Sequence, residues 1–445
     1  MEVPVPKRPS FWQSVTFKLI IIGLLILILL IPGAMIRKLI SERERTQFDV
    51  MSEIGSKWGQ GQTLDGPVLS IPYYHYIEQD GKRYREISYA HFLPDKLVIE
   101  GVVKPEIRYR GIYRMVVYKA MLEVSGAFDF PDTEKLKIDR GSILPEEAFV
   151  QVGISDMRGI QQTLSFRWNG QEQEVEPGMP STDIANSGFH VKVPLQQGDR
   201  FEFLFHLNLN GSDYLYFIPV GKSTNIRMKS TWGHPKFDGA FLPDQRDVAD
   251  TGFTATWNVL HLNRNYPQAW KGTAYQTDAS AFGCHLILPV DQYQKTMRSA
   301  KYGILFIALT FMIIFFVEIL NKWRIHPVQY LLVGLSICIF YVLLLSLSEQ
   351  IGFNLSYLVS GIAIVGLISA YSASIFRKVK TTIILGVCLT LLYAFLFILI
   401  QLTDYALLIG SIGLFVAMGL IMYTSRNVDW YGATSKKNQD RQIGF

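Results

Sequence analysis

Residues 17–36 read FKLIIIGLLILILLIPGAMI, an almost unbroken run of leucine and isoleucine. A helix needs about 20 apolar residues to cross the hydrocarbon core of a bilayer, and this run has that length. A cleavable signal peptide has a shorter apolar core and a small-residue cleavage site. Here the run is followed directly by Arg37 and Lys38. The pattern therefore predicts an uncleaved transmembrane anchor.

Five more apolar runs follow near the other end of the chain, at about residues 302–320, 328–347, 355–376, 381–400 and 405–423. Each is long enough to cross the membrane as a helix. The intervening residues 37–301 contain no such run. The sequence thus predicts an anchor at 17–36, a large domain at 37–301 and a five-helix bundle at 302–424, with short polar ends at 1–16 and 425–445.

The connectors between these runs alternate in charge. Residues 321–324 and 377–380 are basic, as is the tail with Arg426 and Lys436, whereas the connectors near Glu349 and Asp404 have no basic residue. Short basic connectors stay in the cytoplasm. Both termini are therefore predicted to be cytoplasmic and the large domain periplasmic. The net charge of +5 is modest, and much of the basic excess lies in these connectors and the tail, so nucleic-acid binding is not indicated.

The large domain has the pattern of β structure. In residues 201–210 every odd position is apolar and most even positions are polar, as in a half-buried strand. Asp80-Gly81, Asn169-Gly170 and Asn210-Gly211 are favoured hairpin turns. Further strands are expected at 67–77, 83–92, 112–127, 148–154, 225–230, 253–260 and 282–288. One β-sandwich or two smaller ones would satisfy this pattern.

Two other features of the domain have structural meaning. Residues 40–58 have an apolar face that includes Phe48, Met51 and Ile54, which predicts a helix continuing the first span. The tetrapeptide Phe-Leu-Pro-Asp occurs at 92–95 and again at 241–244. Such a repeat arises by duplication of a half-domain or by chance.

The domain shows no familiar catalytic or cofactor motif. Residues 221–224 read GKST but lack the first glycine of a phosphate-binding loop and precede a strand, so an ordinary turn is expected. The eight histidines are scattered without metal-ligand spacing. Arg158, near Asp156, is a candidate for clamping an anionic ligand, the alternative being a loop ion pair. We predict no catalytic residue, cofactor or metal.

Ionisable residues within membrane spans point to function by default. Glu318 and Glu349 lie near the ends of their predicted helices and Asp404 at the start of the last one. None lies at mid-bilayer, which disfavours a coupled transporter. Small residues such as Gly361 and Gly366 predict close helix packing, with self-association into a homo-oligomer as one outcome.

Several segments together resemble the CreD family of bacterial inner-membrane proteins. They include HPVQYLLVGLS at 326–336, GPVLSIP at 66–72, PVDQYQ at 289–294 and RNVDWY at 426–431, so the likeness extends over essentially the whole chain. The resemblance implies a Gram-negative inner membrane, expression within a two-component regulon, and effects on envelope integrity, colicin tolerance and β-lactam response. It implies no reaction or catalytic residue.

The strongest of these segments begins with His326-Pro327, where Pro327 suits a first helical turn. His326, Gln329 and Tyr330 are candidates for contact with a cytosolic partner or lipid headgroups, the alternative being interfacial anchoring. Our leading hypothesis is a non-enzymatic envelope protein whose β domain binds an envelope protein or a cell-wall component. The alternative is a membrane enzyme acting on a lipid or cell-wall precursor with Glu318, His326, Glu349 or Arg158. A transporter ranks third.

Overall fold

The computed structural model describes residues 15–79, 82–195, 200–288, 292–321, 323–376, 378–402 and 405–426. The chain divides into two compact units, each described here by itself. A β unit comprises Gln47–Pro289, and a helical unit comprises Met1–Thr46 with Val290–Phe445.

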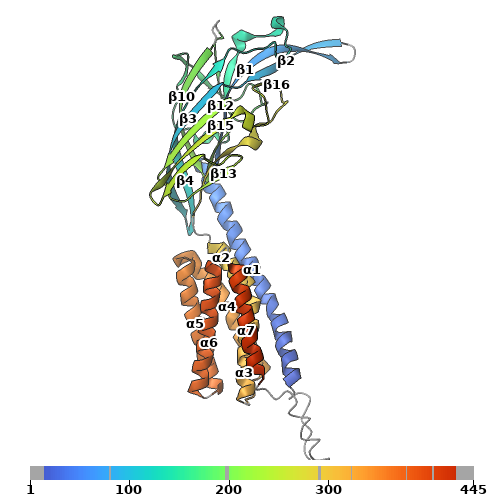
Figure 1. The fold of residues 1–445 in the computed structure, drawn as a ribbon, viewed down its shortest axis with the longest axis vertical. Coiled ribbons are helices and arrows are strands. Elements are labelled where there is room, and N and C mark those ends of the chain that lie inside the picture. Colours follow the sequence, from blue (N-terminus) through green and yellow to red (C-terminus); the bar gives the residue numbers. More distant parts are fainter. Residues whose placement is uncertain are drawn as a thin grey trace, which may run out of the picture. The chain divides into compact units, whose positions relative to one another are not determined.

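Seven α-helices are present in the described residues. They are α1 Val15–Trp58, α2 Gln292–Lys301, α3 Gly303–Leu320, α4 Pro327–Ile351, α5 Phe353–Phe376, α6 Val379–Gln401 and α7 Ala406–Ser425. All except α2 are long and apolar enough to cross a membrane. Figure 1 shows α3 to α7 running side by side. The predicted fold class, six spanning helices with a large β domain between the first and the rest, is confirmed.

Two helices differ from simple membrane spans. Helix α1 continues without interruption to Trp58, so the segment expected at 40–58 is part of the same helix as the anchor. Helix α2 was not foreseen, because residues 292–301 are too polar to span a membrane and were assigned to the outer domain. Its buried residues Tyr293, Thr296 and Ala300 recur at helical spacing. The last strand of the β unit ends earlier, at Leu286.

The β unit consists of two mixed sheets (Figure 1). The first has the order β13-β17-β11-β1-β5-β9-β8, with β2 paired to β1 and β16 to β2. Its strands are β1 Gln62–Gln79, β2 Lys82–Phe92, β5 Phe149–Ile154, β8 Val175–Pro177, β9 Gly188–Lys192, β11 Tyr214–Phe217, β13 Pro235–Gly239, β16 Ala269–Lys271 and β17 Phe282–Leu286.

The second sheet has the order β14-β15-β12-β3-β4-β10-β6-β7. Its strands are β3 Lys96–Arg110, β4 Tyr113–Asp129, β6 Phe166–Trp168, β7 Gln171–Gln173, β10 Arg200–Ser212, β12 Ser223–Ser230, β14 Gln245–Ala249 and β15 Gly252–Leu260. The alternation predicted for residues 201–210 is confirmed, since the odd positions from Phe201 to Leu209 are buried.

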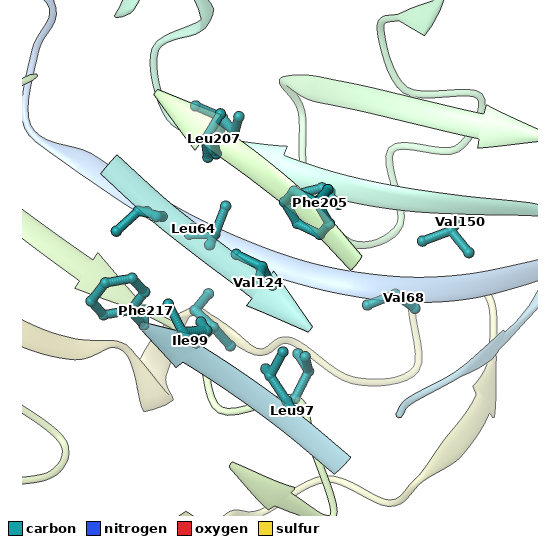
Figure 2. Packing of buried hydrophobic residues seen from close by; sticks show 14 of the residues in the cluster. Leu64, Val68, Leu97, Ile99, Val124, Val150, Phe205, Leu207 and Phe217 are labelled. Atoms are coloured by element: carbon teal, nitrogen blue, oxygen red, sulfur yellow. The ribbon is translucent and has the colours of Figure 1, made fainter. Parts of the chain in front are cut away.

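One hydrophobic core joins the two sheets. A single cluster of buried side chains includes residues of both, so the domain is one sandwich rather than two. Figure 2 shows part of it, with Leu64 and Val68 of β1 beside Val124 of β4 and Phe205 of β10. Burial of these alternating side chains is the main driving force that holds the sheets together.

The three predicted hairpin turns have different outcomes. Asn169 and Gly170 have φ of 49° and 79° and join β6 to β7, as predicted. Asp80-Gly81 lies outside the described residues. The strands on either side of it, β1 and β2, are paired with each other, and the last pair is Gln79 with Lys82. The turn at Asn210-Gly211 is wrong, because β10 continues to Ser212. Gly211 instead makes room for the Tyr118 ring, which lies 2.3 Å from where a Cβ would be.

Strand β3 lies in the middle of its sheet but was not among the predicted strands. Its sequence contains Pro105, which cannot donate a ladder hydrogen bond. The structure explains why this is tolerated. β12 pairs with β3 only as far as Val103, so beyond that point β3 has a neighbour on one side only, the β4 side.

The repeated tetrapeptide occupies equivalent places in the topology. The series β1, β3, β4, β5 and the series β13, β14, β15, β17 both begin in the first sheet, form a hairpin in the second and return to pair with their first strand. The tetrapeptide precedes β3 and β14. Asp95 N–H donates to Ala127 O at 2.8 Å, and Asp244 N–H to Thr256 O at 2.9 Å. This correspondence supports duplication over chance.

Candidate functional site

Three of the predicted residues meet at one end of the helical unit. Glu318 lies in the last turn of α3, His326 is the N-cap of α4 and Tyr330 lies in the first turn of α4. The Glu318 carboxylate accepts hydrogen bonds from the Tyr330 hydroxyl at 2.8 Å and from the Ile325 N–H at 2.9 Å. The short connector between α3 and α4 thus folds back over this carboxylate.

A residue that the sequence analysis overlooked completes the group. Lys18, in the first turn of described α1, forms an ion pair with Glu318. The Glu318 side chain is 1% exposed and the Lys18 side chain 28%. An unpaired charge within a membrane span costs several kcal/mol, so the pair makes both residues acceptable there. The available signal was a lysine inside the first apolar run and a glutamate inside the second, each near one end.

His326 and Gln329 together cap α4. His326 Nδ1 accepts from the Val328 N–H at 3.3 Å, and Gln329 Oε1 accepts from the His326 N–H at 3.0 Å. This reciprocal arrangement satisfies N–H groups that a helix start leaves without partners. Because Nδ1 is an acceptor, we infer that the neutral ring carries its proton on Nε2. Gln329 therefore has a structural role, and His326 keeps one donor free of the cap.

A pocket of about 550 Å³ opens beside these residues. Its polar lining comes from Lys18, Glu318, Arg324, His326 and Tyr330. Its apolar lining comes from the first turns of α1 and from the start of α4, namely Phe17, Ile21, Ile22, Ile325 and Pro327. The lining of the pocket thus combines charged and polar groups with hydrocarbon.

Glu349, another predicted residue, is not part of this site. It lies in the last turn of α4 and accepts a hydrogen bond from the Tyr293 hydroxyl of α2 at 2.9 Å. The 23 residues that separate His326 from Glu349 correspond to about 35 Å along a helix. The two residues therefore cannot act on one small substrate.

Arg158 belongs to the β unit, in a turn after β5. Its Nε and Nη2 donate to Asp156 Oδ1 at 2.8 Å and Oδ2 at 3.0 Å. Asp156 also accepts from the Gln60 N–H at 3.0 Å. Burial opposes ionisation of Asp156, but the hydrogen bonds from Arg158 and Gln60 outweigh it and lower its pKa. The structure shows the loop ion pair of Arg158 with Asp156, and binding of an anion by Arg158 stays a prediction.

The β unit also contains a hydrogen-bonded series of largely buried polar side chains, which no sequence motif predicted. His91 Nε2 lies 3.0 Å from Asp183 Oδ2, and Ser70 Oγ lies 2.9 Å from His91 Nδ1. In a serine hydrolase the nucleophile faces Nε2 instead. Ser70 and His91 are completely buried, so no substrate reaches them. Burial lowers the pKa of His91 although Asp183 opposes this, and the series has a structural role.

Comparison with known proteins agrees with the topology. The family model described as "Inner membrane protein CreD" matches residues 14–431. The inner membrane protein CreD of Escherichia coli (strain K12) is 34% identical over 442 residues, which cover 97% of this chain and 96% of that protein. The chain belongs to the CreD family. The resemblance found in the sequence is confirmed, and this CreD-family chain is a multi-pass protein of the inner membrane.

Membership of the CreD family does not assign a role to any residue. All six candidates, Glu318, His326, Gln329, Tyr330, Glu349 and Arg158, lie within the matched region. The structure brings Glu318, His326 and Tyr330 together, uses Gln329 to cap α4 and separates Glu349 from them. In the described part of the chain, no three His, Cys, Asp or Glu side chains are grouped as metal ligands would be.

Proposed function

We propose that this CreD-family protein supports the integrity of the cell envelope by binding an envelope component, a protein or a cell-wall component, through its β unit, while the helices anchor it. The proposal requires the β unit to face the periplasm. The alternation of basic connectors supports that orientation. The observation that carries the proposal is a trough on the outer face of the second sheet.

The trough extends over the middle strands of that sheet. One hollow of about 540 Å³ is lined by residues of β3, β4, β10 and β12, among them Glu100, Met121, His206 and Arg227. A second hollow of about 380 Å³ extends toward β14 and β15 and shares Val102 and Lys229 with the first. Together they form an elongated surface suited to an extended ligand.

The lining of the trough combines charge with apolar contact. Arg227, Glu100, Glu123 and His206 are successive cross-strand neighbours on β12, β3, β4 and β10. Of these, His206 Nε2 lies within hydrogen-bond distance of Glu123 Oε2, at 3.2 Å. The adjacent row contains exposed Val102 and Met121. Exposed groups of both signs beside hydrocarbon favour recognition of a ligand that carries several polar groups.

No comparable observation favours the enzymatic alternative. Within the helical unit, Glu318 and His326 lie at one end of α4 and Glu349 at the other, and Arg158 belongs to the β unit. Glu318 already accepts three hydrogen bonds, and Arg158 is held by Asp156. A general acid or base has to reach the proton that it transfers, and the Glu318 carboxylate and the Arg158 guanidinium are both hydrogen-bonded to protein groups.

The test is photocrosslinking in living cells. A photoreactive residue replaces Val102 or Met121 in the trough, and Leu262, which is 81% exposed in the same unit but outside the trough, serves as the matched control position. We expect Val102 and Met121 to capture the same species, identified by mass spectrometry, and Leu262 not to capture it. Arg227→Gln with Lys229→Gln is expected to reduce the capture.

Two results contradict this function. Equal capture at Leu262 would mean that the contact is not specific to the trough. Capture of lipid or glycan precursors alone would favour the enzyme or transporter alternatives instead.

A further inference from the structure

The pocket at the Glu318 end of the helical unit carries a net positive charge. Within it Lys18 and Glu318 neutralise each other. Arg324 also lines the pocket, and among the described residues no carboxylate is within ion-pair distance of it. His326 adds the Nε2 donor that is left free by the α4 cap. In the described part of the chain, the pocket thus offers two donor side chains and one positive charge without a carboxylate partner.

Among the described lining residues Glu318 is the one carboxylate, and it does not cancel this charge. Glu318 accepts from Lys18, Tyr330 and the Ile325 N–H. Its oxygens are directed to these donors and its side chain is buried. An anion entering the pocket therefore meets Arg324 and His326, which are exposed, before it meets Glu318.

The remaining lining is hydrocarbon. Ile21 and Ile22 belong to the apolar run of α1, and Pro327 begins the apolar helix α4. A soluble anion has no apolar group that could pack against these side chains, so they do not stabilise its binding. A phospholipid carries its anionic phosphate directly beside acyl chains, so it offers a partner both for the charged side chains of this pocket and for its apolar ones.

We propose that this pocket binds the headgroup phosphate of an anionic phospholipid, with Arg324 and His326 as the donors to the phosphate and the apolar turns of α1 against the acyl chain. Membrane lipids were expected as partners from the sequence in general terms. The new element is a specific site for an acidic phospholipid. It is independent of the trough on the β unit, so either proposal can fail without the other.

Native mass spectrometry of the full-length protein in detergent tests the site. The protein is offered equal amounts of phosphatidylglycerol and phosphatidylethanolamine with identical acyl chains. We expect the wild type to retain more phosphatidylglycerol. Arg324→Gln is expected to lower phosphatidylglycerol binding about five-fold, the effect of one basic residue near a membrane surface, with phosphatidylethanolamine unchanged.

Two matched variants separate this site from surface charge. Lys378→Gln removes one positive charge that lies outside the pocket, where Lys378 Nζ is 5.5 Å from the centroid of the Trp323 ring. We expect it to leave lipid binding unchanged. Arg324→Lys keeps the charge and is expected to retain the preference, which also shows that the position tolerates substitution.

Three outcomes overturn the proposal. Equal retention of the two lipids by the wild type would exclude recognition of an acidic headgroup. An equal loss in Lys378→Gln and Arg324→Gln would mean that general surface charge attracts the lipid. Displacement of phosphatidylglycerol by excess inorganic phosphate would identify the pocket as a site for the free anion.

Discussion

Asp65 is a carboxyl group buried in the interior of the β unit. It lies in β1, and its Oδ2 accepts a hydrogen bond from the Thr277 hydroxyl at 3.0 Å, while Oδ1 has no hydrogen-bond partner among the described residues. Burial raises the pKa of Asp65 to about 7. Thr277 opposes this rise and nearby Asp278 adds to it. The folded protein therefore binds a proton here at pH values where the unfolded chain does not.

This proton makes stability depend on pH. Because the folded pKa of about 7 exceeds the ordinary value of 3.8, the free energy of unfolding falls as pH rises between them. From pH 5 to pH 8 the loss is about 2 to 3 kcal/mol. In Asp65→Asn this contribution is absent. We therefore expect the wild type to lose about 2 to 3 kcal/mol of unfolding free energy relative to Asp65→Asn between pH 5 and pH 8. Urea unfolding of both proteins in detergent measures this change.

Chemical denaturation at both pH values also supplies the control for this prediction. Other titrating groups shift both proteins alike, so only the difference between them matters. Parallel curves for the two proteins from pH 5 to pH 8 would show that Asp65 is ionised in the fold.

Sequence patterns identify single residues only where a rule of position exists. Glu318 was found because charges in spans are rare, and His326 because Pro327 marks a helix start. Asp65 and the series Ser70, His91 and Asp183 follow no such rule. Their partners are distant in sequence, and His91 and Asp183, for example, lie 92 residues apart. Only the assembled sheets bring them together.

The ribbon formed by the ends of β1 and β2 is an arm of the β unit (Figure 1). In the described structure, residues 74–79 and 82–87 pair only with each other. The arm exposes Tyr76, Tyr84 and Ile87. The Arg85 guanidinium lies 3.3 Å from the centroid of the Tyr74 ring. None of the described side chains of the arm contributes to the core.

Shortening the arm is therefore expected to leave the β unit folded. Replacing residues 76–85 by a two-residue Asn-Gly turn should change the free energy of unfolding by no more than about 0.5 kcal/mol, as for surface changes generally. Thermal melting of the full-length protein checks this. Gly211→Ala provides the contrast, because its Cβ meets the Tyr118 ring, and we expect a loss of about 1 to 3 kcal/mol. A large loss on shortening the arm would mean that it packs elsewhere.

Periodicity predicted most elements, and its failures have physical causes. β3 was missed because Pro105 interrupts it, at a place where only one neighbour remains. The turn at Asn210-Gly211 was wrong because the glycine serves close packing and not a positive φ. α2 was missed because it is too short and polar to resemble a span, and its buried face becomes evident only against the other helices.

At the scale of the whole molecule, charge and length patterns predicted six spans and one β domain, since bilayer thickness and the satisfaction of backbone hydrogen bonds constrain both. They also predict an orientation, which labelling of single cysteines tests. The two variants are Leu262→Cys in the β unit and Val379→Cys at the start of α6. The native side chains at these positions are 81% and 76% exposed.

A membrane-impermeant maleimide should label Leu262→Cys in intact spheroplasts. It should label Val379→Cys only after the membrane is permeabilised. The chain without added cysteine is the control for its own three cysteines. Cys284 and Cys338 are buried, and Cys388 is half-buried in the middle of the membrane-spanning helix α6. The reverse labelling pattern would place the β unit in the cytoplasm and remove the basis for binding an envelope component.

The ion pair between Lys18 and Glu318 joins residues 300 positions apart. The ribosome adds about 5 to 20 residues per second. Roughly 15 to 60 seconds therefore pass between the synthesis of Lys18 and that of Glu318. During that time the first helix sits in the bilayer without its counter-charge, and everything between the two residues has been synthesised before the pair can form. Docking of α1 is therefore a late event in the biogenesis of the protein.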